Sequence, residues 1–468
     1  MMTVAALALP TILGLLVISV VLRNETESSF AMRLSLAYPL GMGLLTMQMF
    51  LLALMRVPLR LGYVASLIAI EIVGLFLLIR EKKIGLTRMP SFGLFNEIAS
   101  ADVRWSRKIL VIGLTAIIVV KIGSIFVETY LRPIFAWDSF ANWSAGAKAF
   151  YYSHSLLLDT DPQDFFGKGI LDRNANYPPH NPLMQVWMGL WIGHFNEVLV
   201  KFWSPVYLLA MSVYLYAIMA RETSRLIALS MLVLFLSSPL ISVHAIEAYS
   251  DLPLSVYLLF SLIMFLFAMR GEHEYWVLMG LYSAEALFTK DEAPFFVIPL
   301  VLAAITFYWQ NRKQGLVPRK AVVALFASLL LAAPWFIFKL SHHLGFGADY
   351  IKLKWTVQPQ IAWRVVMMLL SFRNFNVFFF IFPLLLMLTW RQSKEFIFLF
   401  VPMLCYALFF MLVYSLTEFY AGGLMFNTAV FRNIMSYYPI ICLLTSLLIK
   451  TVMMSGNEAL APKNKCIQ

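Results

Sequence analysis

The sequence has few of the residues that build soluble or disulfide-linked proteins. Charged residues make up 13% of its 468 residues, whereas soluble domains contain about a quarter. The three cysteines, Cys405, Cys442 and Cys466, have no regular spacing, so neither a disulfide framework nor a zinc cluster is indicated. Hydrophobic residues make up 61%, and the mean hydropathy is +0.79. These values predict an all-α, polytopic integral membrane protein.

Apolar runs long enough to cross a bilayer recur along the whole chain. Since a crossing needs about 20 apolar residues, we predict about 13 transmembrane helices. The first run has no basic leader and no clear cleavage site, so it is expected to be retained. The predicted helices lie near residues 2–22, 34–55, 61–79, 109–131, 198–220, 226–243, 252–269, 276–289, 293–309, 321–338, 375–390, 396–416 and 433–449.

The distribution of Lys and Arg predicts the orientation. Placing the basic segment 80–108 in the cytoplasm gives the cytoplasmic loops more basic residues than the outer loops, and it puts the N-terminus outside. Much of the net charge of +11 is then a topology signal, and no feature calls for nucleic acid. Polar groups from five separate segments, including the long loops 132–197 and 339–374, then lie on the outer face. Interleaved basic and aromatic residues in loop 339–374 suit membrane lipids or an anionic glycan.

The stretch WDSFANW (residues 137–143) follows an apolar run and places Asp138 where a membrane span meets water. A carboxylate is costly to keep there for structure alone, so Asp138 is the first candidate for chemistry. Apolar residues at steps of three and four predict an interfacial helix through Phe150, with Asp138 at or near its N-cap. The alternative is that Asp138 only caps this helix.

The segment YPPHNP (residues 177–182) predicts a rigid turn, because each proline fixes φ and removes a hydrogen-bond donor. The turn either presents Tyr177 and His180 to a substrate or only leads into the next interfacial helix, 183–195.

Further on, His244, Glu247 and Asp251 share one helical face if the helix continues through them. Such a trio could hold a divalent cation, or it is a solvated helix end. Pro253 favours a helix that restarts with Asp251 near its N-cap.

Two further groups of charges flank apolar runs. Lys290, Asp291 and Glu292 interrupt the run 276–309, which is too long for one crossing, so the helix is expected to break there. These charges either face a substrate, with Lys290 suited to a lipid phosphate, or satisfy one another and the broken helix ends. Arg432 opens the last span, and its guanidinium suits bidentate binding of phosphate; the alternative is an interfacial arginine that reaches lipid headgroups.

The order of these motifs resembles the GT-C superfamily of membrane glycosyltransferases, which includes protein O-mannosyltransferases and the lipid A aminoarabinose transferase. The resemblance covers about residues 109–310 and the arginine of the last span. It implies a catalytic core 109–310, which is followed by a C-terminal region 311–468 with outer loop 339–374 and a short cytoplasmic tail. Region 1–108, with three predicted helices and a basic loop, departs from the family pattern and is either an added N-terminal unit or a sign of a shifted register. The motifs are WDSFANW (137–143) with Lys148-Ala149, Tyr177-Pro178, YSDLP (249–253) and TKDE (289–292).

The resemblance implies an inverting enzyme that moves a sugar from a polyprenyl phosphate to a glycan, lipid or protein. Its catalytic base corresponds to Asp138. Family members often carry a second acid nearby, whereas Ser139 follows here, so no cofactor is specified and a divalent cation is left open. We expect the remaining candidates to bind substrate: Tyr177, His180, Glu247, Asp251, Lys290, Glu292 and Arg432.

The simplest location is a bacterial inner membrane with the site facing the periplasm. Two alternatives are an O-antigen polymerase or ligase, and a lipid-glycan transporter or flippase. A transporter is expected to show charges at mid-membrane and two matching halves. Only Lys121 is an isolated basic residue deep in a predicted span, and the hydropathy halves do not pair.

Overall fold

The protein is all-helical over the residues that its structure, a computed structural model, describes. These are residues 2–23, 29–84, 104–157, 176–314, 317–345, 358–390, 396–416 and 424–460; side chains of the last segment are described from 428 to 454. Parts of the loops 132–197 and 339–374 and the end of the tail lie outside these ranges. No strand occurs within them. The predicted all-α fold class is therefore confirmed.

Ten helices within the described ranges are long and apolar enough to cross a membrane, or eleven if one bent pair is a single span. The predicted count of about thirteen is not confirmed. The difference lies in residues 226–243, which form the bent pair, and in 276–289 and 375–390, which form helices of 13 and 12 residues. The long helices and helix pairs are α1 (Met2–Val21), α2 (Phe30–Leu54), α3 (Leu61–Glu81), α5 (Trp105–Leu131), η2 with α9 (Leu199–Lys201, Trp203–Glu222), α12 (Asp251–Met269), α14 (Pro294–Asn311), α15 with α16 (Arg319–Leu329, Ala333–Ser341), α20 (Ile397–Leu416) and α21 (Leu424–Leu460).

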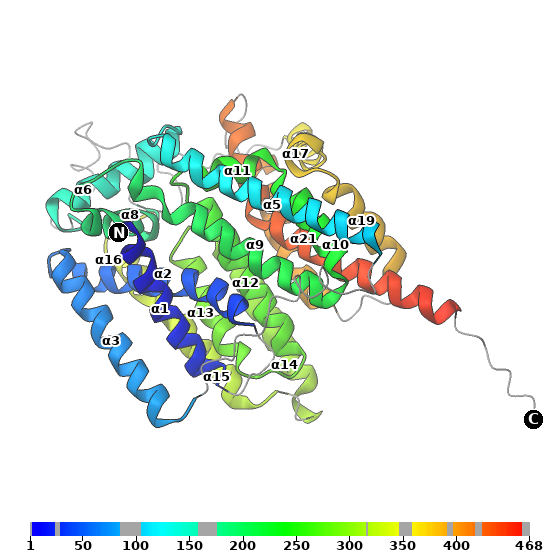
Figure 1. Cartoon of the computed structure of the whole chain (residues 1–468), viewed down its shortest axis with the longest axis horizontal. Helices are drawn as coiled ribbons and strands as arrows, with labels where there is room; N and C mark the ends of the chain where they lie inside the picture. The colour runs from blue at the N-terminus through cyan, green and yellow to red at the C-terminus, as the bar shows by residue number, and fades with distance from the viewer. Residues whose placement is uncertain are drawn as a thin grey trace, which may run out of the picture.

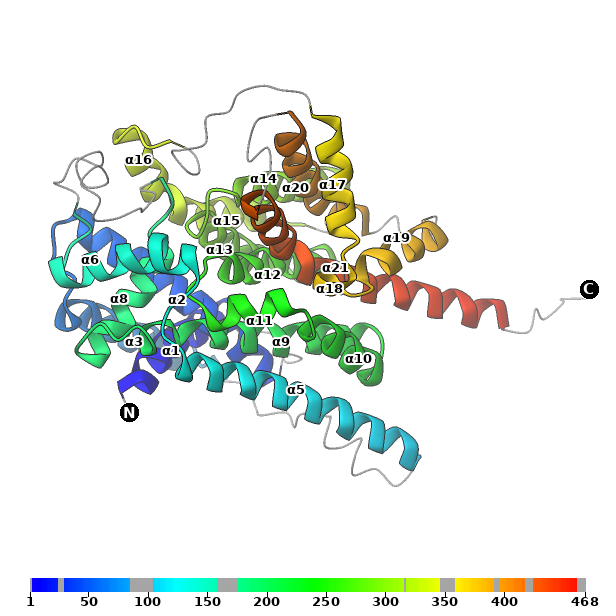
Figure 2. The ribbon, with the colours of Figure 1, turned by 90° about the horizontal axis from the view of Figure 1, so that it is seen from above.

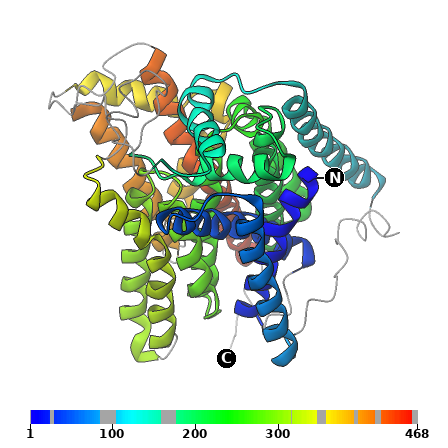
Figure 3. The same cartoon turned by 90° about the vertical axis from the view of Figure 1, so that its left-hand side faces the viewer.

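The shorter elements connect or cover the long helices. They are η1 (Ser139–Ser144), α6 (Ala145–Ser153), α8 (His180–Ile192), α10 (Arg225–Leu236), α11 (Pro239–Ile246), α13 (Tyr275–Leu287), η3 (Arg312–Gln314), η4 (Leu330–Ala332), α17 (Pro359–Leu369), α18 (Phe372–Phe375) and α19 (Phe378–Thr389). Helices α6 and α8 pack against each other at one end of the bundle, which is the upper end in Figures 1 and 3. This placement agrees with interfacial helices in the first long loop.

The core of the bundle is formed by α12 and its neighbours. Nearly all residues of α12 are buried, and α12 packs against α13, α21 and α9. In contrast, α3 and α5 expose most of their apolar side chains and line the edges of the molecule, as Figure 2 shows for α5. A helix that is apolar all round suits these edges only if lipid covers it.

Three breaks in the helices occur at the end of the bundle that carries α6 and α8. The run 276–309 ends α13 at Leu287 and restarts at Pro294, so the predicted break at Lys290 is confirmed. Helices α10 and α11 meet at 70°, where Pro239 opens α11. The connection between α11 and α12 is an extended segment that begins at Glu247. These breaks free polar side chains from lipid-facing helices.

Candidate functional site

Arg432 on α21 is the centre of a cluster of ion pairs. Its Nε and Nη2 donate to Oδ2 of Asp251 at 3.1 and 3.0 Å, and its Nη1 donates to Oδ2 of Asp138. One guanidinium can contact two carboxylates in this way because its N–H groups point in fixed directions within a plane. Arg432 therefore joins the start of the first long loop to the start of α12.

Lys290 lies on the other side of Asp251. Its Nζ is 3.0 Å from Oδ1 of Asp251 and 2.9 Å from Oε1 of Glu292. Burial disfavours the charged form of Lys290, but the carboxylates of Asp251 and Glu292 outweigh this effect and raise the pKa of the lysine. Both cations of the site are therefore charged at neutral pH, and the second oxygen of Glu292 has no hydrogen-bond partner within the described ranges.

Local sequence explains why these groups leave their helices. Asp251 is the first residue of α12, where the helix dipole favours a carboxylate. Lys290 and Glu292 lie in the break that precedes Pro294, so their side chains are not part of a lipid-facing helix. The exposed fraction of the side chain rises from 0% for Asp251 to 18% for Arg432 and 28% for Asp138. Asp138 is therefore the accessible carboxylate of the cluster.

Asp138 immediately precedes η1, as the sequence predicts. Its side chain makes no capping hydrogen bond among the residues described, and it contacts Arg432 instead. The helix continues from η1 into α6 and ends at Ser153, with a turn of π-helix over 139–144. The geometry therefore does not support helix capping as the role of this carboxylate.

Aromatic rings surround the cations. The Arg432 guanidinium carbon lies 5.1 Å from the ring centre of Tyr249, and the ring of His244 lies 4.6 Å from the same ring. Burial raises the pKa of Tyr249 to about 12, so its hydroxyl stays protonated. Lys290 Nζ lies 5.9 Å from the ring centre of Tyr177. These rings can restrain the cations by cation–π attraction.

His180 lies away from this cluster, at the start of α8. Its side chain is 0% exposed. Its Nδ1 lies 2.6 Å from the hydroxyl of Thr46, and its Nε2 lies 3.3 Å from the hydroxyl of Tyr257 and 3.5 Å from that of Tyr207. Burial lowers the pKa of His180 to about 3, so the ring is neutral at ordinary pH. The ring therefore connects α8 to α2, α9 and α12.

Glu247 also lies outside the cluster. It forms an ion pair with Lys201 at 3.2 Å, and both side chains are 0% exposed. The helix does not continue from His244 to Asp251, because α11 ends at Ile246 and Glu247 is extended. The condition for a shared helical face of His244, Glu247 and Asp251 is therefore not met, although His244 Nε2 still lies 3.9 Å from Asp251. The predicted restart is confirmed, because α12 begins at Asp251.

No cluster of three or more metal-ligating side chains occurs among the described residues. Around Asp251, Arg432 and Lys290 occupy the positions beside the carboxylate. These contacts leave the carboxylate neutralised by side chains.

Two buried ion pairs were missed by sequence reasoning. Lys201 pairs with Glu247, and Lys339 of α16 pairs with Asp291 at 2.6 Å while it donates to the backbone oxygen of Asn176 at 2.9 Å. The sequence signal that could have identified them is the position of the two lysines. Both occur at the ends of predicted apolar spans, where an ionisable group needs a partner. Which acid each would meet depends on the tertiary fold.

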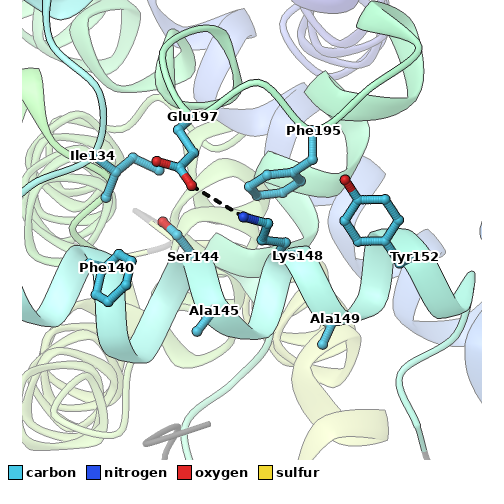
Figure 4. A pocket seen from close by; sticks show the side chains of 9 residues that line it. All are labelled: Ile134, Phe140, Ser144, Ala145, Lys148, Ala149, Tyr152, Phe195 and Glu197. Atoms are coloured by element: carbon cyan, nitrogen blue, oxygen red, sulfur yellow. Dashed lines mark hydrogen bonds and ion pairs between the residues drawn. The ribbon is translucent and has the colours of Figure 1, made fainter. Parts of the chain in front are cut away.

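A cavity of about 370 Å³ lies against the helix that follows Asp138. Figure 4 shows Lys148 on this helix paired with Glu197 across the cavity, at 3.3 Å. The hydroxyl of Ser144 lines the cavity and has no partner within the described part of the chain. The remaining lining residues are Ile134, Phe140, Ala145, Ala149, Tyr152 and Phe195. Asp138, Asp251 and Arg432 are not in this lining, so the cavity is separate from the cluster.

A second cavity, of about 670 Å³, is a groove along α15, η4 and α16. Its lining is entirely apolar and includes Leu287, Phe326, Phe336 and Leu340. Leu287 ends α13 just before the break that carries Lys290, and Leu340 follows Lys339. The groove therefore reaches the same end of the bundle as the ion-pair cluster.

Comparisons with known proteins show what family and fold this chain resembles. A family model described as dolichyl-phosphate-mannose-protein mannosyltransferase matches residues 177–338. This range includes Glu247, Asp251, Lys290 and Glu292 but neither Asp138 nor Arg432. A comparison with curated protein sequences finds no match.

The fold is similar to the crystal structure of ArnT from Cupriavidus metallidurans in the apo state. The TM-score is 0.50 and the sequence identity 15%, and the match covers 74% of this chain. The chain matches 60% of the length of ArnT. The family match and the shared fold confirm the resemblance to the GT-C superfamily of membrane glycosyltransferases, and they support an integral, multi-pass membrane protein.

Proposed function

We propose that this protein is an inverting glycosyltransferase that moves a sugar from a polyprenyl phosphate to an acceptor hydroxyl. The observation that carries the proposal is the position of Arg432, which bridges the accessible Asp138 and the buried Asp251 while Lys290 neutralises the other oxygen of Asp251. Two carboxylates and two cations from four distant segments of the chain meet in this cluster. The reaction needs this set: one base and cations for a phosphate leaving group.

Asp138 is the proposed base. Its carboxylate accepts the proton of the acceptor hydroxyl while that oxygen bonds to the anomeric carbon of the sugar. The bond between this carbon and the phosphate oxygen breaks at the same time, and the electron pair leaves with the polyprenyl phosphate. A single displacement of this kind inverts the configuration at the sugar carbon, in contrast to enzymes that use a carboxylate as nucleophile.

Arg432 and Lys290 are the proposed phosphate ligands. Arg432 donates to Asp138, so the carboxylate of Asp138 is paired with a cation. A donor phosphate competes with Asp138 for this guanidinium. Donor binding therefore frees Asp138 to act as a base. Asp251 keeps Arg432 in place, because it still accepts hydrogen bonds from Nε and Nη2 of the arginine.

The apolar groove on α15 and α16 is the proposed place for the prenyl chain. Two of its lining residues, Leu287 and Leu340, are close in sequence to Lys290 and Lys339, so a chain in the groove would lead its phosphate toward the cations. Beside Lys290 lie the ring of Tyr177 and the oxygen of Glu292 that has no hydrogen-bond partner among the described residues. They suit an apolar sugar face and a sugar hydroxyl. His180 serves to hold α8 in place, since its two ring nitrogens contact other side chains.

This end of the bundle is proposed to face the periplasm of a bacterial inner membrane. That orientation follows from the basic segment 80–108, which the distribution of Lys and Arg places in the cytoplasm. The acceptor is a glycan, a lipid or a protein.

The experiment that tests the proposal is sugar transfer from a panel of radiolabelled polyprenyl-phosphate monosaccharides, in membranes that carry wild type or Asp138→Asn. Transfer is expected to fall by about 10²- to 10⁴-fold in the variant, as for loss of a general base. Donor binding should persist. Glu128→Gln is the matched control, because Glu128 is an exposed carboxylate near the end of α5 that pairs with Arg132 one turn away. Equal transfer by wild type and Asp138→Asn would contradict the role of Asp138. No transfer from any donor by wild type would contradict the proposed activity.

A further inference from the structure

The buried ion pair of Lys201 and Glu247 lies beside the segment that carries Asp138. Lys201 ends η2, at the start of the α9 span, and Glu247 follows α11 in extended conformation. Their charged atoms are 3.2 Å apart, and both side chains are fully enclosed. A pair this deeply buried is costly to desolvate, so its position needs an explanation beyond stability.

The pair binds the backbone between α5 and η1. Lys201 Nζ donates to the carbonyl oxygen of Pro133 at 3.1 Å. The backbone N–H groups of Phe135 and Ala136 donate to Oε2 of Glu247 at 3.4 and 3.5 Å. These backbone groups are not part of a helix and need partners where water is excluded. Asp138 is only two residues beyond Ala136, so the pair limits where Asp138 can lie.

The same connection that contains Glu247 also carries Asp251. Next to Glu247, the N–H of Ala248 donates to the hydroxyl of Ser139 at 3.0 Å, and the carbonyl oxygen of Ala248 accepts from Asn181 at 2.9 Å. Residues 247 and 248 therefore bond to both sides of Asp138, and Asp251 begins α12 three residues later. One short connection sets the positions of both carboxylates that face Arg432.

We infer that Lys201, Glu247 and Ser139 are positioning residues that hold Asp138 at its working distance from Arg432 and Asp251. The inference rests on the proposed function of Asp138. Glu247 has no room for a substrate role in this geometry, because its side chain is enclosed and both of its oxygens accept hydrogen bonds. Its effect on the reaction acts through the backbone of residues 133–136. Displacements of about 1 Å at a reacting group can reduce a rate by about 10²-fold, so such a restraint has a measurable effect.

The test compares Glu247→Gln and Ser139→Ala with wild type. The glutamine keeps one acceptor oxygen but loses the charge that holds Lys201, and the alanine removes the hydroxyl that accepts from Ala248. We expect kcat for sugar transfer, per folded molecule, to fall by about 10- to 100-fold in Glu247→Gln and by less in Ser139→Ala. The KM for the polyprenyl-phosphate donor should not change, because neither residue contacts Arg432 or Lys290, the proposed phosphate ligands. The pH profile of kcat should shift on the limb that reports the base.

The matched control is Glu222→Gln. Glu222 is also a buried carboxylate held by cations, but it lies at the other end of α9. This variant should lower thermal stability without changing kcat per folded molecule. If Glu247→Gln behaves in the same way, the ion pair is only structural and the inference is overturned.

Ser139→Ala keeps the test decisive if Glu247→Gln does not fold, since wild-type kcat and pH profile in that variant would also overturn the inference. The proposed function fails separately: it requires transfer by wild type and loss in Asp138→Asn. Absence of transfer by wild type would overturn the function and the inference together, whereas active wild type with unaffected positioning variants would overturn the inference alone.

Discussion

The two ends of the helix bundle each hold one buried carboxylate between an arginine and a lysine. At one end, Asp251 lies between Arg432 and Lys290; at the other, Glu222 lies between Arg270 at 2.6 Å and Lys450 at 2.8 Å. Both clusters join distant helices. Among the described residues, the Glu222 cluster consists of one acid and two cations.

The clusters differ in what lies beyond the cations. The side chains of Arg270 and Lys450 are 32% and 37% exposed, so both cations are partly accessible. In contrast, Arg432 and Lys290 continue to second acids, Asp138 and Glu292. A cation shared by two acids can exchange one of them for a phosphate and keep the other. An ion-pair cluster is therefore suited to chemistry when a cation can exchange one acid for a substrate group. It is suited to a structural role when its cations share a single buried acid.

The largest expected effect comes from removing the buried carboxylate of each cluster, Asp251 at one end and Glu222 at the other, and comparing the two losses. Asp251→Asn leaves Arg432 and Lys290 without their shared carboxylate, so the cations reorient toward Asp138 and Glu292. We expect transfer to fall by about 10³-fold, as for loss of a preorganised electrostatic group. Thermal unfolding and transfer assays on Asp251→Asn and Glu222→Gln check this. Equal sugar transfer per folded molecule in the two variants would contradict the proposed functional difference between the two ends.

A smaller effect is expected for Arg432→Lys. Lysine keeps the charge but not the planar fork, so it cannot contact Asp138 and Asp251 in the same way. We expect about a 10²-fold loss of transfer, with a higher KM for the donor because the phosphate loses a ligand. Arg270→Lys, in which the exposed arginine of the other cluster is replaced, is the control and should retain transfer.

We expect the stability of the protein to depend on pH through His180, which lies at the end of the bundle that carries the candidate site. Its pKa is lowered to about 3 in the folded protein by burial, from about 6.5 in an unfolded chain. Its contribution is present above about pH 6.5 and is lost as the pH falls toward 3, because the unfolded chain then binds a proton that the folded protein excludes. Between pH 6.5 and 5, the thermal stability of His180→Gln should therefore change less than that of wild type. Parallel pH curves would show that His180 is not enclosed as described.

The smallest effect is expected at the cavity behind the Asp138 helix. Lys148 and Glu197 are 50% and 38% exposed, and exposed pairs contribute about 0–1 kcal/mol. Lys148→Met and Glu197→Gln should therefore change neither thermal stability nor transfer by a measurable amount. A large loss of transfer in either variant would indicate that this cavity takes part in the reaction.

Much of the fold could be predicted from local patterns. The long apolar runs, the break at Lys290 and the helix after Asp138 depend on residues close together in the chain, and each appears in the structure. The count of spans is not confirmed, because hydropathy does not separate a full crossing from a helix of 12 or 13 residues, such as α19 or α13.

The candidate site could be predicted only in part. The sequence selected Asp138, Asp251, Lys290 and Arg432 as charges that interrupt or border apolar runs, and the structure brings these four together. It places His180 and Glu247 in separate buried contacts. The partner of an ionisable group near a membrane is chosen by the packing of helices that are far apart in sequence.

The sequence by itself determined that this chain lies in a membrane, that a helix breaks at Lys290, and which charges must find partners, because hydropathy and helix breakers act over a few residues. Only the tertiary structure decided which charges meet. It joined Arg432 to Asp138 and Asp251, and Lys201 to Glu247. The physical reason is that a buried charge is tolerated only beside an opposite charge or a hydrogen-bond partner, and here that partner comes from another helix.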